Sequence, residues 1–391
     1  MAEDSGQWAV ALTRLRRAFN KSATRRRTTI CLLSSVFCLL SCGKEPLYQE
    51  QAYVFGTLVD VSIYGESEPR ARQAANGVLQ EFQRLHNLLH AWQPSELSEL
   101  NAAFAKGESM AVSAELAAML RDAAQLAQQS QGLFNPAIGG LVQLWGFHAD
   151  EFGAALPDEK QVAALVASKP QMSDLVFNPS RPPLVRGGEA AQAPSPDKGR
   201  VGEGFEVRSN NKAVQLDLGG YAKGYALDRA AEILRKQGIG NALVNIGGNV
   251  LALGQRGKRP WRVGLQHPRK PGALAALELH DGEALGTSGD YQRYFMLGEK
   301  RYCHLIDPRS GHPAQGVQAV TVLTRGARAG VLSDTASKPL FIAGSGGWRA
   351  AAAQMNLTEA MLVDALGNIR LTAELQKRLE FADKDIHPQV E

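Results

Sequence analysis

The amino-acid sequence predicts an α+β domain in which helices flank a mostly antiparallel sheet. Apolar residues recur at helical spacing over residues 69–91 and 113–131 in the first half of the chain. The second half is rich in short alternating segments, such as 241–254 and 318–324, with a helical segment at 222–236 among them. This mixture of helices and strands is typical of the α+β class.

The first half predicts four elements in order. Residues 53–64 alternate as a strand, with a short interruption by glycine and threonine. A helix over 69–91 comes next, and then a turn with a short helix over 91–101. The helix over 113–131 follows Ser113, a residue type that favours the N-cap.

The second half predicts one helix within a series of strands. Arg235 and Lys236 close the helix over 222–236, where cations favour the negative end of the helix dipole. A further helical segment is expected near 347–364. The expected strands lie within 205–218, 241–254, 261–268, 273–280, 293–308 and 318–324.

These elements predict a single domain over residues 53–375. A tether over 42–52 precedes it, and a tail over 376–391 follows it. Proline, glycine and charged residues dominate residues 177–204, and nothing in them alternates. We interpret this segment as a disordered surface insertion, because a strand-like pattern resumes directly after it.

The charge of the chain gives no support for a nucleic-acid partner. The formal net charge is +4 over 391 residues. Residues 1–41 hold seven of the 43 Lys and Arg residues and two of the 39 Asp and Glu residues, which leaves 36 basic against 37 acidic residues. Without a basic surface, binding to nucleic acid is not expected.

The basic cluster at the N-terminus has the order of a secretory signal. Three arginines, 25–27, precede an uncharged run of 15 residues, which is short for a membrane span. The run ends in LLSC at Cys42 and resembles the bacterial lipobox, which implies cleavage before Cys42 and a lipid on its thiol. The body is then expected on the periplasmic side of a bacterial membrane; an uncleaved N-terminal anchor is the alternative.

Cysteine usage agrees with this interpretation. Of the four cysteines, only Cys303 lies beyond the signal and the lipid site, so the body is expected to lack an internal disulfide. Its neighbour His304 offers a Cys–His nucleophile, but the sequence shows no orienting third group.

Residues 217–228, DLGGYAKGYALD, predict a place for an anionic ligand. The glycines at 219 and 220 allow the backbone to approach a ligand, and the free N–H groups of the following helix favour an anion. Lys223 adds positive charge, and Asp228 is a candidate acceptor for a sugar hydroxyl. A purely structural role is the alternative, and the dinucleotide fingerprint G-x-G-x-x-G is missing.

Three further stretches support a polar, glycine-lined site. Gly248 belongs to a glycine pair within a strand pattern, where glycine is unfavourable unless a ligand or another backbone comes close. Ser288 lies in GTSGDYQRYF, and His304 lies before Asp307 at the end of an expected strand. Each stretch also suits ordinary turn chemistry.

Taken together, the stretches resemble the ApbE family of FAD:protein FMN transferases. The matching segments occur in family order over about residues 53–345: FGTLVDVSIYG, PSELSELN, QGLFNPAIGGLVQLWGF, LDLGGYAKGYALDRAAEIL, LVNIGGNVLALG, PWRVGLQHP, LGTSGDYQRYF, HLIDPRSGHP and SDTASKPLFIAG. The resemblance implies an ApbE-type domain related to the T-fold. It also implies transfer of FMN from the donor FAD to a Ser or Thr hydroxyl of an exported protein of an electron-transfer complex, with release of AMP and with Mg²⁺ assisting.

The resemblance also assigns site residues. His304 matches the family histidine that is a proposed base. The flavin contacts carried over by position are Phe55, Ala91, Trp92, Lys223 and Leu305. Asn135 stands where the family usually has an aspartate, which removes a charge near the flavin.

The family's metal site is the main departure. Its ligands correspond to the carbonyl of Gly220, to Asp334 and to a threonine that is Lys338 here. A protonated lysine cannot ligate Mg²⁺. Asp334 and Lys338 are four residues apart and can pair on one helix, so we expect the ammonium in or beside the metal position. The departures leave two alternatives open, hydrolysis of FAD to FMN and AMP, and non-catalytic FAD binding for a maturation system.

Overall fold

The computed structural model describes residues 47–149, 153–179 and 205–391. The expected signal, Cys42 and most of the expected insertion lie outside these residues. Within the described ranges, no helix combines the length and the apolar character needed to cross a membrane. The α+β prediction is confirmed, with a nine-stranded sheet in the order β1-β2-β6-β7-β10-β13-β14-β15-β17. All of its neighbouring strands are antiparallel except β15 and β17.

The longest helices are α1, α3, α6 and α7. Their bounds are α1 Glu68–Leu89, α2 Glu96–Lys106, α3 Ala114–Gln129, α4 Gly139–Leu144, α5 Glu159–Ala167, α6 Gly219–Lys236, α7 Ala329–Gln354 and α8 Ala373–Gln376. The strands of the large sheet are β1 Leu47–Val54, β2 Thr57–Tyr64, β6 Ala242–Ile246, β7 Asn249–Leu253, β10 Glu283–Gly289, β13 Val317–Arg325, β14 Ala360–Asp364, β15 Ile369–Leu371 and β17 Gln389–Val390.

Three smaller sheets complete the fold. Their strands are β3 Met110–Val112, β4 Leu175–Pro179 and β5 Phe205–Ser209; β8 Trp261–Gln266, β9 Ala273–Leu279 and β16 Glu380–Phe381; and β11 Tyr294–Leu297 with β12 Lys300–Cys303.

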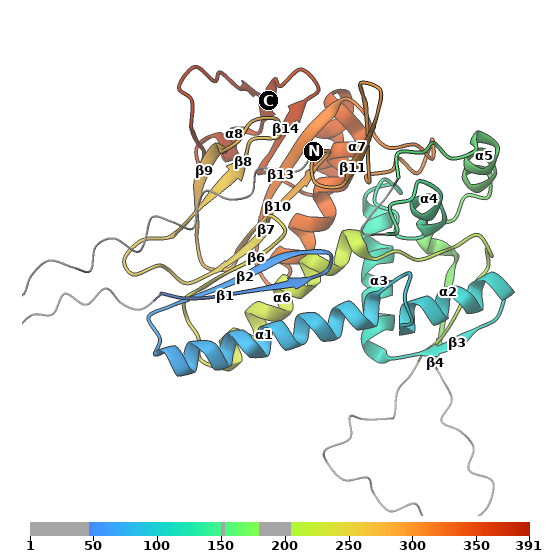
Figure 1. The fold of residues 1–391 in the computed structure, drawn as a ribbon, viewed down its shortest axis with the longest axis horizontal. Coiled ribbons are helices and arrows are strands. Elements are labelled where there is room, and N and C mark those ends of the chain that lie inside the picture. Colours follow the sequence, from blue (N-terminus) through green and yellow to red (C-terminus); the bar gives the residue numbers. More distant parts are fainter. Residues whose placement is uncertain (1–46, 150–152, 180–204) are drawn as a thin grey trace, which may run out of the picture. The chain divides into compact units, whose positions relative to one another are not determined.

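The large sheet is covered by helices on one face and by a small sheet on the other (Figure 1). Alternation along β13 shows the two faces: Val320 and Val322 are buried against α7, while Leu323 joins the core formed with β8 and β9. This follows from the period of two in a strand, which sends successive side chains to opposite faces.

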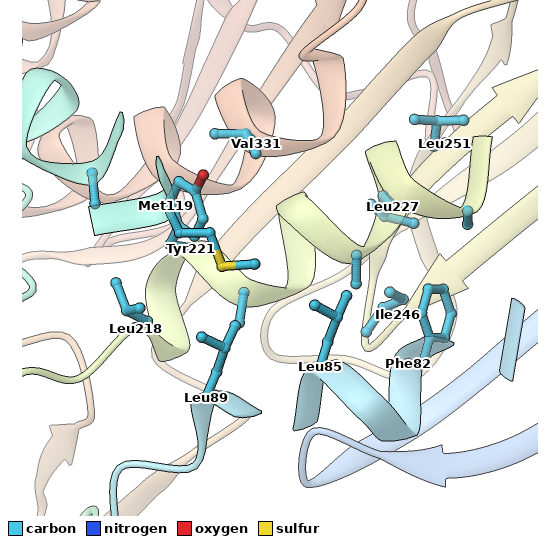
Figure 2. Packing of buried hydrophobic residues seen from close by; sticks show 14 of the residues in the cluster. Phe82, Leu85, Leu89, Met119, Leu218, Tyr221, Leu227, Ile246, Leu251 and Val331 are labelled. Atoms are coloured by element: carbon cyan, nitrogen blue, oxygen red, sulfur yellow. The ribbon is translucent and has the colours of Figure 1, made fainter. Parts of the chain in front are cut away.

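Helix α6 lies at the centre of the largest core. Figure 2 shows Leu85 and Leu89 of α1 on one side of α6 and Val331 of α7 on another. Each of these side chains is at most 6% exposed. The helix predicted over 69–91 is confirmed, and the 3.6-residue spacing of its apolar positions packs one face of α1 against α6.

Helices α6 and α7 cross with almost no space between their backbones. A Cβ added at Gly224 would lie 2.4 Å from the carbonyl oxygen of Gly330, and one added at Gly330 would lie 2.3 Å from that of Gly224. On its other side, α7 rests on β10, where a Cβ at Gly286 would lie 2.3 Å from the carbonyl oxygen of Ser333. Three glycines thus allow α7 to pack tightly between α6 and the sheet.

Two carboxylates fix the same crossing by hydrogen bonds. Asp228 accepts from the backbone N–H groups of Gly330 and Val331 at 2.7 and 2.9 Å. Asp334 accepts from the backbone N–H of Gly224 at 2.9 Å. The start of α7, whose first N–H groups have no partner within the helix, is thereby satisfied by a side chain of α6.

The structure corrects several boundaries. The segment 53–64 is not one interrupted strand but contains the end of β1, a turn and β2, and β1 pairs with β2 over its whole length. Because β1 begins at Leu47, the expected tether over 42–52 is too long. Residues 177–179 belong to β4 and not to an insertion. The expected tail 376–391 contributes β16 and β17 to sheets. The expected helix near 347–364 is wrong at both ends, because α7 already begins at Ala329 and β14 occupies Ala360–Asp364.

We expect Gly330→Ala to lower the free energy of unfolding by about 1–3 kcal/mol, because the new methyl group would force the two helices apart. Gly346→Ala is the control in the part of α7 beyond the kink at Gly344, since a Cβ there meets nothing within 4 Å. The control should leave stability unchanged or raise it by up to about 1 kcal/mol through helix propensity. Urea denaturation of both variants measures the difference; equal stabilities would contradict the close crossing.

Candidate active site

A cleft of about 610 Å³ opens where α6 and α7 meet the β1–β2 turn and the loops around residues 133–138, 287–293 and 304–306. Its size is ordinary for a small-molecule site. Most of the residues singled out from the sequence line it, although they come from seven separate parts of the chain. These lining residues are Phe55, Ala91, Trp92, Asn135, Gly220, Lys223, Ser288, His304, Leu305, Asp334 and Lys338.

The start of α6 provides the anion-favouring corner of the cleft. Gly219 and Gly220 are the first residues of the helix and have no left-handed conformation, so the helix expected over 222–236 begins three residues earlier. The N–H of Gly219 donates to the carboxylate of Asp217 at 2.8 Å. Two further N–H groups of this turn donate to a backbone carbonyl, so most of the N–H groups expected to be free already have partners. The helix start therefore favours an anion through its dipole, and Lys223 adds an ammonium group about one helical turn later.

The surroundings of Lys223 disfavour the protonated, charged form of its amino group. Burial lowers the pKa of its ammonium group, and the nearby cations Lys338 and Arg293 lower it further, against the opposite effect of Asp334. An anion in the cleft would relieve this penalty. The site is therefore electrostatically prepared for a negatively charged ligand.

His304 lies directly after β12, as the sequence predicted, and its tautomer is determined by the backbone. Its Nδ1 lies 3.2 Å from the carbonyl oxygen of Arg293. Because a carbonyl oxygen can only accept, Nδ1 must carry the proton and donate. In the neutral ring, Nε2 is then the nitrogen that can accept a proton.

His304 is held neutral in the free protein. Burial lowers the pKa of its imidazole to about 3, and the charges of Lys223 and Arg293 contribute in the same direction. The ring therefore remains able to accept a proton throughout the physiological range. A bound anion that compensates the two cations would raise the pKa of the imidazole and make it a stronger base.

Aromatic rings form part of the lining of the cleft. Phe55 occupies the β1–β2 turn with φ of 57°, followed by Gly56 with φ of 67°, and packs edge-on against His86. Trp92 makes an edge contact with His148, with ring centroids 5.5 Å apart. These rings offer stacking surfaces for a flat heteroaromatic ligand.

Sequence reasoning missed Arg293 and Asp217 as members of the site. Arg293 lines the cleft, donates to the carbonyls of Phe147 and Ala149 and supplies the carbonyl that orients His304. Asp217 also lines the cleft, and burial raises the pKa of its carboxyl group. The position of Asp217 two residues before the glycine pair was a usable signal, whereas nothing in the sequence pointed to Arg293.

Two predicted ligand contacts are corrected by the structure. Asp228 does not line the cleft, because its carboxylate is used by the start of α7, and burial raises its pKa to about 7. Gly248 belongs to the turn between β6 and β7, and its neighbour Gly247 is the one that lines the cleft. Asn135 lines the cleft, but its amide donates to the carbonyl of Pro170 and its oxygen accepts from the N–H of Ala137.

The residues at the expected metal position do not fit a divalent cation. The ammonium of Lys338 lies 2.6 Å from Oδ1 of Asp334 and 2.7 Å from its carbonyl oxygen, while Oδ2 accepts from Gly224. The carboxylate is thus already neutralised by a cation of the chain itself. In the described ranges, no group of three His, Cys, Asp or Glu side chains is arranged to hold a metal ion.

Comparison with known proteins decides the family. The model of the ApbE family matches residues 55–362. The chain belongs to the ApbE family. It is 43% identical over 338 residues to the FAD:protein FMN transferase of Rhodobacter capsulatus, covering 86% of this chain and 59% of that protein. With the enzyme of the same description from Treponema pallidum it shares 32% identity, covering 73% and 76% of the two chains.

Solved structures agree with this membership. The ApbE protein of Thermotoga maritima superimposes with a TM-score of 0.71 at 27% identity, covering 85% of this chain and 99% of the other. The flavin transferase ApbE of Vibrio cholerae gives a TM-score of 0.67 at 21% identity, which supports the fold. The ApbE-type fold expected from the sequence is therefore confirmed.

We expect the ring of His304 not to titrate between pH 5 and pH 8 in the free protein, because its folded pKa is about 3. Addition of ADP, which carries a pyrophosphate, should raise the pKa of the ring by compensating the neighbouring cations. Nitrogen NMR shifts of labelled histidine measure both effects, with His304→Asn identifying the signal. A midpoint near the ordinary value of about 6.5 without ligand would contradict the buried, cation-flanked environment.

Proposed function

We propose that the chain is an FAD:protein FMN transferase, which moves FMN from FAD to a Ser or Thr hydroxyl of an exported protein and releases AMP. The observation that carries the proposal is the cleft that places His304, Lys223 and the start of α6 around one space beside aromatic rings. The names of the relatives agree with it. The chain spans 59% of the length of the Rhodobacter protein.

The cleft favours FAD as the donor substrate. The rings of Phe55 and Trp92 suit the isoalloxazine, and the positive start of α6 with Lys223 suits the pyrophosphate. Burial disfavours the positive charge of Lys223, and the negative charge of a bound pyrophosphate would compensate it. The site therefore recognises both the flat and the anionic part of the donor.

His304 has the geometry of the base. The acceptor hydroxyl attacks the phosphorus on the flavin side of the pyrophosphate, and the bond from this phosphorus to the bridging oxygen breaks. The bridging oxygen leaves with AMP, and the hydroxyl proton passes to Nε2 of His304, whose Nδ1 is occupied by the carbonyl of Arg293. Positive charge on Lys223 and Lys338 offsets the negative charge that develops on the leaving group.

The location and partner extend the proposal. The arginine cluster, the apolar run and Cys42 support a lipid-anchored protein on the periplasmic side of a bacterial membrane. An enzyme in that place would meet its acceptor after export, which favours a subunit of a membrane electron-transfer complex. Mg²⁺ has no role in this proposal, because Lys338 occupies the expected ligand position.

Incubation of the protein with FAD and an exported acceptor that carries a flavin-accepting threonine tests the activity. We expect covalent flavin fluorescence on the acceptor and an equal amount of AMP. His304→Asn should lower the rate by about 10²–10⁴ while retaining FAD binding, since a positioned base contributes this much. His387→Asn, on the surface, is the control. FMN and AMP without modified acceptor, or FAD recovered unchanged, would contradict transfer.

A further inference from the structure

The floor of the cleft contains an ion pair between a lysine and an aspartate. A binding site for a divalent cation does not ordinarily include a lysine ammonium, because both are positively charged. Lys338 and Asp334 lie one turn apart on α7, and the exposed fractions of their side chains are 14% and 3%. An ion pair this deep is stable only when its hydrogen bonds are satisfied. Asp334 meets this condition, because one of its oxygens accepts from Lys338 and the other from Gly224.

The side chain of Lys338 is confined to this position by its neighbours. A Cβ added at Gly220 would lie 2.7 Å from Cε and 3.0 Å from Cδ of Lys338. The lysine stem therefore runs directly over the first turn of α6, in the space that any residue other than glycine would fill. The ammonium is held at the point where the start of α6, Asp334 and the open cleft meet.

The ammonium still has hydrogen-bonding capacity for a ligand. An ammonium group has three donors. Among the described residues, its hydrogen bonds go to Oδ1 and to the carbonyl oxygen of Asp334. One N–H therefore remains, and Lys338 lines the cleft in which the ligand must lie.

We propose that Lys338 is a built-in replacement for the divalent cation, so that this chain binds the pyrophosphate of its donor through Lys338 and Lys223 without Mg²⁺. The inference rests on the proposed function, which supplies the pyrophosphate. A divalent ion brought to Asp334 would have to displace the ammonium from its paired carboxylate and would be repelled by the ammonium. The protein thereby uses the single, covalently held positive charge of Lys338 in place of the double charge of a dissociable Mg²⁺ ion.

Measurement of metal binding and donor affinity tests the proposal on the intact wild-type protein. We expect no detectable binding of Mn²⁺, followed by its electron paramagnetic resonance signal, at concentrations up to millimolar. The dissociation constant for FAD, followed by flavin fluorescence, should change less than threefold between EDTA and millimolar Mg²⁺. Tight Mn²⁺ binding, or a tenfold gain in FAD affinity with Mg²⁺, would overturn the proposal.

The variant Lys338→Thr converts the floor of the cleft into a set of oxygen ligands. We expect it to lose at least tenfold in FAD affinity in EDTA, to recover most of this loss in Mg²⁺, and to bind Mn²⁺. Lys236→Thr is the matched control, because Lys236 also pairs with a carboxylate four residues earlier but on the exposed side of α6. Equal Mg²⁺ dependence in wild type and Lys338→Thr would overturn the proposal.

The outcomes separate this inference from the proposed function. Wild-type protein that binds FAD independently of Mg²⁺ but modifies no acceptor would contradict the transferase activity and support the replacement of the metal ion by Lys338. Transfer of FMN that stops in EDTA would support the transferase activity and contradict the replacement of the metal ion by Lys338. The wild-type measurements need no variant, so they remain decisive if Lys338→Thr proves unstable.

Discussion

The close crossing of α6 and α7 is the constraint on which the rest of the structure depends. Gly224 and Gly330 bring the two backbones together, and Asp228 and Asp334 tie each helix to the other by hydrogen bonds to backbone N–H groups. A change at this crossing would move the start of α6, which forms the anion-favouring corner of the cleft. The same contacts therefore support both the core and the site.

The crossing also determines the electrostatics of the cleft. Asp334 is used by Gly224 and Lys338, so its negative charge is compensated before any ligand arrives. Lys223 and Arg293 add positive charge beside it, and together with burial they keep His304 neutral. An anionic substrate would relieve the repulsion among the cations and raise the basicity of the histidine at the same moment. Binding and activation of the base are thus coupled through charge alone.

Local sequence signals predicted much of this site, and the signals that failed did so for physical reasons. The spacing of Asp334 and Lys338 predicted their pairing, because residues four apart share a helix face. The prediction that Asp228 contacts the ligand was wrong, because its carboxylate accepts hydrogen bonds from the start of α7, which is distant from it in the sequence. Arg293 was missed because its role depends on a carbonyl and on a loop that only the folded chain brings to His304.

The boundaries show the same limit. Residues 47–52 and 376–391 carry too little pattern to predict strands, and pairing with β2, β9 and β15 is what orders them. Such short edge strands are stabilised by their neighbours more than by their own composition. In contrast, the helical periodicity of 69–91 and the glycine-rich start of α6 are local features, and the structure retains both.

A crystal structure of the complex with FAD, grown in Mn²⁺ and recorded with anomalous scattering, would show whether Lys338, held by the helix crossing, provides the positive charge for the pyrophosphate. We expect Nζ of Lys338 within hydrogen-bonding distance of a pyrophosphate oxygen and no anomalous peak beside Asp334. A manganese peak coordinated by Asp334, with Lys338 turned away from the phosphates, would contradict it.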